Sequence, residues 1–341
     1  MLFSDVSIDT VVHVDAPVRL SSAEIMARLA ATLVRLGIRP DLLEEVAGIR
    51  ERRIWGGTDG QQPVSVAATL AGRKALDAST AGPDRIGLLV STSVCRDFIE
   101  PSIAAVVHGA LGLPPTCQNF DLGNACLAFL NGMDVAGLMI ERGDIDFALI
   151  VDGEVSDEVT ECTIERLGRA QTTAEQFRAE FASLTLGSGA TAMVLGRSEL
   201  LPHGHRYLGG VTRAATAYAD LCRGTMQRMV TDTRTLLAEG LNLAESTFEA
   251  TSAALGWRSG ELDHFVLHQV SKVHTEALIA RLGLDSEKAL TTFPDRGNIG
   301  PASVPLTLSV LNEQGRLRTG DRVALMGIGS GLNCTMAEIV W

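Results

Sequence analysis

The chain has 341 residues, about twice the length of an average domain, so it can bury a large core without disulfides or metals. Hydrophobic residues make up 46% and charged residues 21% of it, a balance that indicates a folded protein and excludes a disordered one. The formal net charge of −12 opposes long-range attraction to nucleic acids and anionic membranes.

The amino-terminal segment and the cysteine pattern predict a soluble cytoplasmic protein. Residues 1–17 carry acids where a signal peptide needs a basic and then an apolar segment, and no apolar run approaches the length of about 18 residues that spans a bilayer. The six cysteines are scattered and never form a CxxC pair, which favours reduced thiols over a disulfide framework or a zinc site. We therefore expect no membrane insertion.

Apolar periodicity and turn residues predict the elements of the first half in chain order. A capping box at residues 21–24, followed by apolar residues at helical spacing, predicts a helix that stops at Gly37. A second helix is expected over residues 63–78. Buried strands and a third helix complete this half, with strands at 86–93, 117–121, 146–154 and 186–196 and the helix from Cys126 to about Glu141.

The second half of the chain repeats this order. The run 263–271 corresponds to 84–93, a helix beginning near Ser303 corresponds to the helix at Cys126, and 321–331 corresponds to the strand that starts at 146. A repeat of this length indicates a duplicated mixed α/β half in which sheets are layered with helices. The pattern alone leaves chance similarity between apolar strands open.

The repeat divides the chain into two expected halves. We place them at residues 1–196 and 197–341, with an inserted cap at about 155–181 that has no counterpart in the second half. Two such halves would pack as pseudo-symmetric partners. The ends of equivalent strands would then meet at one place.

Cys126 lies where a strand, a tight turn of small residues and a helix start meet. The positive end of a helix dipole favours a thiolate, and a free backbone amide at a helix start can bind an oxyanion. From position alone, a nucleophile and a small buried core residue are equally consistent with this cysteine. The other five cysteines lack this context, and we expect structural roles for them.

His268 and Asn298 are the polar residues that a duplicated fold would bring toward Cys126. His268 ends an apolar strand, and Asn298 lies in a glycine-bracketed loop before the repeat helix. Singly, a strand-end His is more often structural, and a loop Asn usually serves a turn. Together the three suit thioester chemistry, because a thiolate accepts an acyl group while two neutral donors stabilise an enolate oxygen.

Two further segments have both an ordinary and a functional interpretation. Glu100 precedes a proline in an expected loop, where it would be a solvated turn residue, or a base if the loop delivers it into an apolar site. Arg52, Arg53 and Trp55 combine charge with an aromatic ring. This segment is either a solvated turn or a site for a phosphorylated adenosine.

Two patterns are rejected as cofactor sites. The glycine-rich run 327–331 follows a strand but lacks the GxGxxG spacing and the following helix of a dinucleotide site. His203 and His205 would need a third ligand that the sequence does not indicate. We therefore expect a surface loop there and no metal site.

The stretches around the candidate residues resemble the thiolase-fold condensing enzymes. ACLAF at Cys126, HQVS at His268, GNIGPASVPL at Asn298 and GIGSGLNC near the end match, in order and spacing, the Cys-His-Asn set of ketoacyl-acyl-carrier-protein synthase III and its relatives. The resemblance covers almost the whole chain. Further stretches, including VAGIRERRIW, TSVCRDFIEPS and CRGTMQRMVTDTR, are most similar to the OleA branch, whose members join two fatty acyl-CoA molecules head to head in long-chain olefin synthesis.

This resemblance implies a homodimer with a thiolase fold, in which two duplicated halves form five αβαβα layers. It implies that Cys126 is acylated by the first acyl-CoA, and that His268 and Asn298 hold the thioester oxygen during condensation. Ser330 matches a backbone donor that completes the oxyanion hole with the amide of Cys126. Glu100 matches a glutamate proposed as the base for the second substrate, contributed by the partner subunit.

The resemblance also implies partners and leaves alternatives. Arg52, Arg53 and Trp55 lie where the related synthase binds the CoA nucleotide. We expect acyl-CoA as substrate with no other cofactor, downstream olefin-pathway enzymes as possible partners, and no nucleic acid. A decarboxylative 3-oxoacyl-acyl-carrier-protein synthase III and a noncatalytic acyl-CoA binding protein remain as alternatives.

Overall fold

The computed structural model describes residues 1–56, 63–258 and 260–341. Within these residues nine strands form one mixed sheet, in the order β11-β12-β13-β8-β1-β7-β6-β4-β5. Their bounds are β1 Val6–Asp15, β4 Ile86–Ser91, β5 Gln118–Asp121, β6 Phe147–Glu154, β7 Gly189–Arg197, β8 His205–Ala214, β11 His264–Leu267, β12 Arg322–Gly329 and β13 Asn333–Val340.

The pairing of the strands repeats between the two halves of the chain. In the first half β4 pairs in parallel with β6, and β6, β7 and β1 follow as antiparallel neighbours. In the second half β11 pairs in parallel with β12, and β12, β13 and β8 follow in the same antiparallel manner. The predicted duplication is therefore confirmed. The two parts of the sheet join where β1 pairs with β8 at Ser7 and Ile8.

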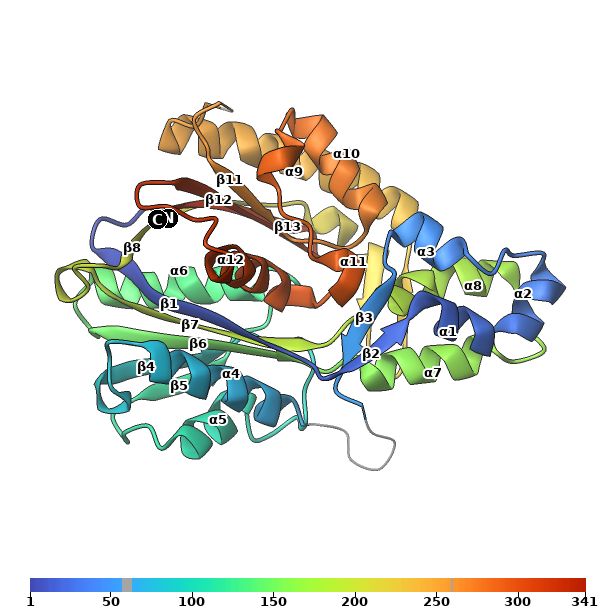
Figure 1. Cartoon of the computed structure of the whole chain (residues 1–341), viewed down its shortest axis with the longest axis horizontal. Helices are drawn as coiled ribbons and strands as arrows, with labels where there is room; N and C mark the ends of the chain where they lie inside the picture. Colours follow the sequence, from blue (N-terminus) through green and yellow to red (C-terminus); the bar gives the residue numbers. More distant parts are fainter. Residues whose placement is uncertain (57–62, 259) are drawn as a thin grey trace.

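Helices lie in three layers around the two parts of the sheet, which gives the expected αβαβα order (Figure 1). The central layer is α6 (Ala128–Glu141) and α12 (Ser303–Glu313), one outer layer is α4 (Val64–Ala78) and α5 (Ile103–Leu111), and the other is α9 (Thr233–Leu255) and α10 (Lys272–Leu282). The two central helices pack in an apolar core that includes Leu130, Met133, Leu308 and Leu311.

The first predicted helix is present as two short helices. The capping box forms at Ser21, where α1 (Ser22–Arg28) begins, and Gly37 ends α2 (Ala30–Leu36) with a left-handed φ of 64°. The chain bends at Leu29, which lies between them with φ −100° and ψ 6°. Both predicted ends of the helix are confirmed, and its continuity is not.

The cap is larger than the sequence predicts. α7 (Asp157–Leu167) and α8 (Ala174–Glu180) occupy the predicted segment, but they share an apolar core with α1, α2 and α3 (Leu42–Ala47). A two-stranded antiparallel sheet of β2 (Val18–Ser21) and β3 (Glu51–Ile54) completes this part, which projects beside the layers in Figure 1. The cap therefore combines two distant segments of the first half.

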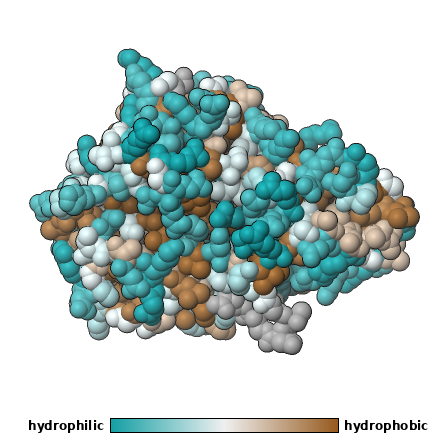
Figure 2. All heavy atoms as spheres, in the orientation of Figure 1, coloured by the Kyte–Doolittle hydropathy of each residue, from teal (hydrophilic) through white to brown (hydrophobic). Residues whose placement is uncertain are grey.

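The second half carries its own small additions. β9 (Cys222–Gly224) and β10 (Met229–Thr231) form a hairpin, and α11 (Phe293–Arg296) precedes α12. Figure 2 shows hydrophilic side chains over most of the face seen in Figure 1, with apolar side chains in separate patches. Across the described residues no helix is both long and apolar enough to span a membrane.

Candidate active site

Cys126 lies in a tight turn between β5 and α6. Ala125 has a positive φ of 46°, which residues other than glycine rarely adopt, and α6 begins two residues after Cys126. Asn124 braces the turn: its Nδ2 donates to Oδ1 of Asn131 at 2.7 Å, and its Oδ1 accepts from Nδ2 of Asn333 at 3.2 Å. Both halves of the chain therefore hold the nucleophile candidate in place.

The turn between β12 and β13 packs directly on the backbone of Cys126. A Cβ atom on Gly329 would lie 3.3 Å from the amide nitrogen of Cys126 and 3.1 Å from that of Leu127. Ser330 follows this glycine and lines the same cavity as Cys126. Because residue 329 is glycine, the turn that carries Ser330 can approach the turn that holds Cys126.

His268 follows directly after β11. Its backbone amide donates to the Met326 carbonyl at 2.8 Å, which extends the pairing of β11 with β12 by one residue. Burial, with a smaller contribution from His274, lowers the pKa of His268 from 6.5 to about 4. At neutral pH the imidazole is therefore uncharged, with one N–H donor and one acceptor nitrogen.

Asn298 lies in the loop between α11 and α12, and backbone hydrogen bonds fix it against the segment that leads into β7. Its amide donates to the Thr185 carbonyl and its carbonyl accepts from the Gly187 amide, both at 2.9 Å. Its side-chain Oδ1 accepts from the Gly300 amide at 3.1 Å. This bond orients the side chain so that Nδ2 is the group left to donate.

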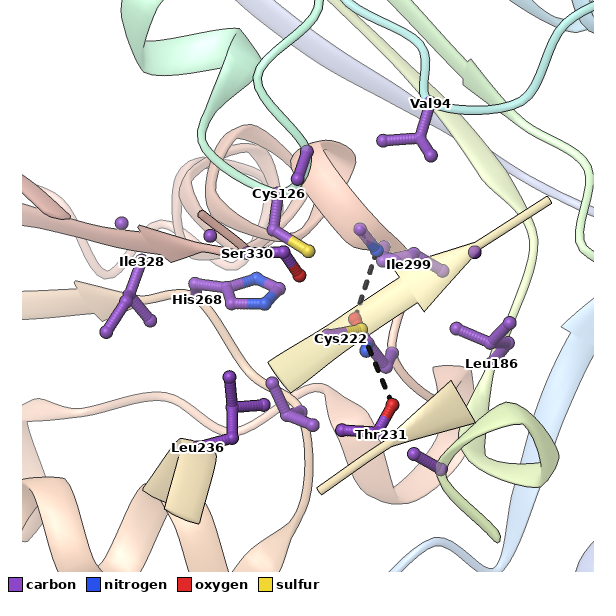
Figure 3. Close-up of a pocket in the computed structure, with 18 of the residues that line it drawn as sticks. Val94, Cys126, Leu186, Cys222, Thr231, Leu236, His268, Ile299, Ile328 and Ser330 are labelled. Atoms are coloured by element: carbon purple, nitrogen blue, oxygen red, sulfur yellow. Dashed lines mark hydrogen bonds between the residues drawn. The ribbon is translucent and has the colours of Figure 1, made fainter. Parts of the chain in front are cut away.

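The structure brings four of the predicted site residues to one cavity of about 660 Å³, namely Cys126, His268, Asn298 and Ser330. Figure 3 shows the Cys126 sulfur, the His268 ring and the Ser330 hydroxyl directed toward the same space. The rest of the wall is mostly apolar. Residues of α9, α10 and the β9–β10 hairpin contribute to it, together with the loop after β4 and residues of β12 and β13. A cavity of this size with few polar groups is typical of a site for an apolar organic ligand.

Burial dominates the electrostatics of Cys126. It raises the pKa of the thiol to about 12, and Cys222 and Glu154 add to the effect. The expectation that a helix end favours the thiolate is therefore wrong for this structure, because α6 begins only at Ala128 and lost solvation outweighs the helix dipole. The thiol is protonated at neutral pH, so it can act as a nucleophile only when its proton leaves.

Glu100 does not line the cavity of its own chain. It lies on the loop of residues 92–102 between β4 and α5, and it is exposed. Its neighbours Phe98 and Ile99 are 57% and 98% exposed. A tip that presents apolar side chains beside a carboxylate is typical of a segment that contacts another molecule.

Arg52 and Trp55, two of the candidates for CoA binding, have structural roles. Arg52 is fully buried and donates to the Leu184 carbonyl at 3.0 Å, and burial lowers its pKa to about 10. Trp55 is also buried, and its indole N–H donates to the Glu154 carbonyl at 3.0 Å. The structure contradicts a nucleotide-binding role for these two, while Arg53 is partly buried and lies outside the cavity wall.

Sequence analysis did not identify Glu154, which ends β6 and lines the cavity. Burial raises the pKa of this carboxyl to about 7, although hydrogen bonds from Cys95 and Val94 oppose the shift. A signal was present in the sequence, because an acidic residue at the carboxyl end of a buried parallel strand points to a functional edge of the sheet. The β9–β10 hairpin, which supplies Cys222 and Met229 to the cavity, was also missed.

Relatives of known family match the chain from end to end. It is 56% identical to an acyl-CoA:acyl-CoA alkyltransferase of Xanthomonas campestris pv. campestris and 35% identical to one of Shewanella oneidensis, with 100% of both chains covered in each case. A beta-ketoacyl-acyl-carrier-protein synthase III of Desulfitobacterium hafniense is 26% identical over 86% of this chain and 87% of its own. Residues 252–341 match the family 3-oxoacyl-acyl-carrier-protein synthase III C terminal.

Solved structures agree with these sequence matches. A cysteine-to-alanine variant of Xanthomonas campestris OleA is 56% identical, with a TM-score of 0.97 over 100% of this chain and 98% of that chain. A cysteine-to-serine variant of the same protein, solved with bound lauric acid and lauroyl-CoA, has the same TM-score and covers 100% of both chains. The chain therefore belongs to the acyl-CoA:acyl-CoA alkyltransferase family, the OleA enzymes, within the thiolase-fold condensing enzymes.

Proposed function

We propose that this protein joins two long-chain fatty acyl-CoA molecules by a non-decarboxylative Claisen condensation, which yields a 2-alkyl-3-oxoacyl-CoA. The observation that carries the proposal is that Cys126, His268, Asn298 and Ser330 share one mostly apolar cavity in a chain 56% identical to the Xanthomonas alkyltransferase. A thiol beside neutral donors suits thioester exchange, and the apolar wall suits alkyl chains. The product would be the first intermediate of long-chain olefin synthesis.

In the first half-reaction the thiol of Cys126 takes an acyl group. The sulfur attacks the thioester carbonyl, the bond to the CoA sulfur breaks, and the thiol proton ends on the released CoA. Neutral His268 is the group placed to relay this proton. The backbone amides of Cys126 and Ser330 form the oxyanion hole, in which one donor is typically worth about 3 to 4 kcal/mol.

In the second half-reaction the α-carbon of another acyl-CoA attacks the acyl-enzyme. Asn298 and His268 donate hydrogen bonds to its thioester oxygen as the enolate forms, and Glu100 of the partner subunit removes the α-proton. The new carbon–carbon bond forms as the bond to the Cys126 sulfur breaks. The proton held by the glutamate then restores the thiol, so the reaction balances with acyl-CoA alone and needs no further cofactor.

We propose a homodimer in which each Glu100 enters the partner's site. Its exposure beside Phe98 and Ile99, outside its own cavity, supports this arrangement. Solved structures of Xanthomonas OleA include variants at a glutamate, a cysteine and a histidine, and the intervals between those positions equal the intervals between Glu100, Cys126 and His268. Six free cysteines further support a reducing, cytoplasmic location.

Mass spectrometry of the purified protein with myristoyl-CoA as the sole substrate tests the proposal. We expect acylated Cys126, free CoA, and the long-chain ketone that forms when the condensed product is hydrolysed and decarboxylated. Glu100→Gln should acylate at the wild-type rate and give no ketone, whereas Cys126→Ala should give neither signal. Acyl-enzyme that accumulates until a malonyl thioester is added would indicate a decarboxylative 3-oxoacyl synthase. Binding without acylation would indicate a noncatalytic acyl-CoA binding protein.

A further inference from the structure

The loop of residues 92–102, which carries Glu100, is held in place by hydrogen bonds to carboxylates. Some of these carboxylates lie in the loop, and others lie at the ends of neighbouring strands. Asp97, within the loop, accepts from the first two amides of α4 at 2.6 and 2.9 Å. Asp121, at the end of β5, accepts from the first two amides of α5 at 3.0 and 2.8 Å, directly after the loop. These bonds hold the middle and the far end of the loop against two helices, while its tip projects.

The near end of the loop is fixed by the last residues of β6. Glu154 accepts from the Val94 amide at 2.6 Å through Oε1 and from the Cys95 amide at 3.4 Å through Oε2. Two residues earlier on the strand, Asp152 accepts from the Thr92 hydroxyl at 2.6 Å. The direction in which the chain leaves β4 therefore depends on side chains of β6.

A buried carboxylate such as Glu154 is an unusual residue for a purely structural role. It is 5% exposed, and no described cation forms a salt bridge with it. A buried carboxylate without a cation is destabilising relative to a neutral group of the same shape. A residue that lowers stability at the wall of an active-site cavity points to a role in function rather than in folding.

We propose that Glu154 is the positioning residue for Glu100. By holding the amides of Val94 and Cys95, it sets the path of the loop and so places the Glu100 carboxylate in the partner's site. This inference rests on the proposed condensation and on the proposed dimer. Because Glu154 also lines the cavity that contains Cys126 of its own chain, an effect through the loop must be distinguished from a local effect.

The first test compares homodimers in both half-reactions. Glu154→Gln keeps the shape of the side chain but replaces one acceptor oxygen by a donor, so it can hold only one of the two amides. We expect acylation of Cys126 within about twofold of wild type and ketone formation reduced at least tenfold. Glu338→Gln is the matched control, since Glu338 is also buried but lies on β13 and bonds to Trp257 and Arg322. The Glu338→Gln control should change the rates of acylation and of ketone formation by the same factor.

The second test uses mixed dimers purified with two different tags. In one arrangement Glu100→Gln and Glu154→Gln are in the same subunit and the partner is wild type; in the other, each subunit carries one change. If Glu154 acts through its own loop, the same-subunit dimer keeps one intact loop and about half of wild-type condensation. The divided dimer then keeps at most about one fifth of the activity of the same-subunit dimer. If Glu154 acts locally on its own cavity, the order of the two dimers reverses.

Three results would overturn the inference: Glu154→Gln homodimers that condense at the wild-type rate, equal loss of acylation and condensation, or the reversed order of the mixed dimers. Should Glu154→Gln fail to fold, Glu154→Asp, whose shorter carboxylate cannot reach both amides, replaces it in each comparison. Failure of the proposed function is distinguishable, because wild-type protein would then form no ketone from myristoyl-CoA.

Discussion

Replacing Gly187 by alanine should displace Asn298 and slow the chemistry. An alanine Cβ at this position would lie 1.9 Å from the carbonyl oxygen of Arg296, whereas real Cβ contacts essentially never fall below 3.0 Å. One of the two segments must therefore move by about 1 Å. The same segments share the hydrogen bond from the Gly187 amide to the Asn298 carbonyl at 2.9 Å, so the movement transfers directly to the donor residue. A misplacement of about 1 Å typically reduces catalysis about 100-fold, and overpacking destabilises a core by about 1 to 3 kcal/mol.

The assay follows ketone formation from myristoyl-CoA and, separately, acylation of Cys126, with urea unfolding as the measure of stability. We expect condensation to fall about 100-fold and acylation far less, because the proposed mechanism uses Asn298 in the second half-reaction. Gly189→Ala is the matched control, since a Cβ there meets its nearest atoms at 3.6 and 3.8 Å. Equal activity of Gly187→Ala and Gly189→Ala would refute the reasoning.

Three further predictions concern the cavity. Alkylation of Cys126 by iodoacetamide in the free enzyme should accelerate about tenfold per pH unit between pH 7 and 9, because the pKa of the thiol is about 12; a plateau below pH 9 would contradict this. The pKa of Glu154 rises from 4.5 in the unfolded chain to about 7 in the folded one, so wild-type stability should fall by roughly 3 kcal/mol as pH rises through that window. In urea titrations, the free energy of unfolding of Glu154→Gln should not show this fall with pH. Parallel pH profiles of the two proteins would show that Glu154 does not cause it. Leu236→Trp should lower kcat/KM for palmitoyl-CoA about tenfold more than for octanoyl-CoA, and an equal loss for both would show that Leu236 does not contact the acyl chain.

The sequence predicts most of the layered fold, because its strands are apolar runs bounded by turn residues. The structure confirms β4, β6, β12 and α12 within a few residues of their predicted ends. The 23-residue helix α9 was missed, since hydroxyl side chains dilute its apolar face. Thr247 and Thr251 are buried there and donate to backbone carbonyls four residues earlier, which makes polar residues compatible with a core position.

The positions of the candidate site residues could be predicted, because they depend on chain topology. Their ionisation could not be predicted, because it depends on solvation. The positions of Cys126, His268 and Asn298 follow from strand ends and turns, which local pattern reveals. The ionisation of the thiol depends on how completely the rest of the chain excludes water from it, and no local pattern contains that information. Arg52 was misinterpreted for the same reason, because its burial is created by distant residues such as Leu184.

The division of the site between the two repeats has a consequence for biosynthesis. Cys126 belongs to the first half of the chain, whereas His268, Asn298 and Ser330 belong to the second. On a ribosome the thiol emerges well before the groups that would activate thioesters beside it, and domains fold broadly in the order of their synthesis. A nascent chain therefore carries the cysteine without His268, Asn298 and Ser330 until β12 and β13 dock, so the complete set of groups forms only when the second half folds.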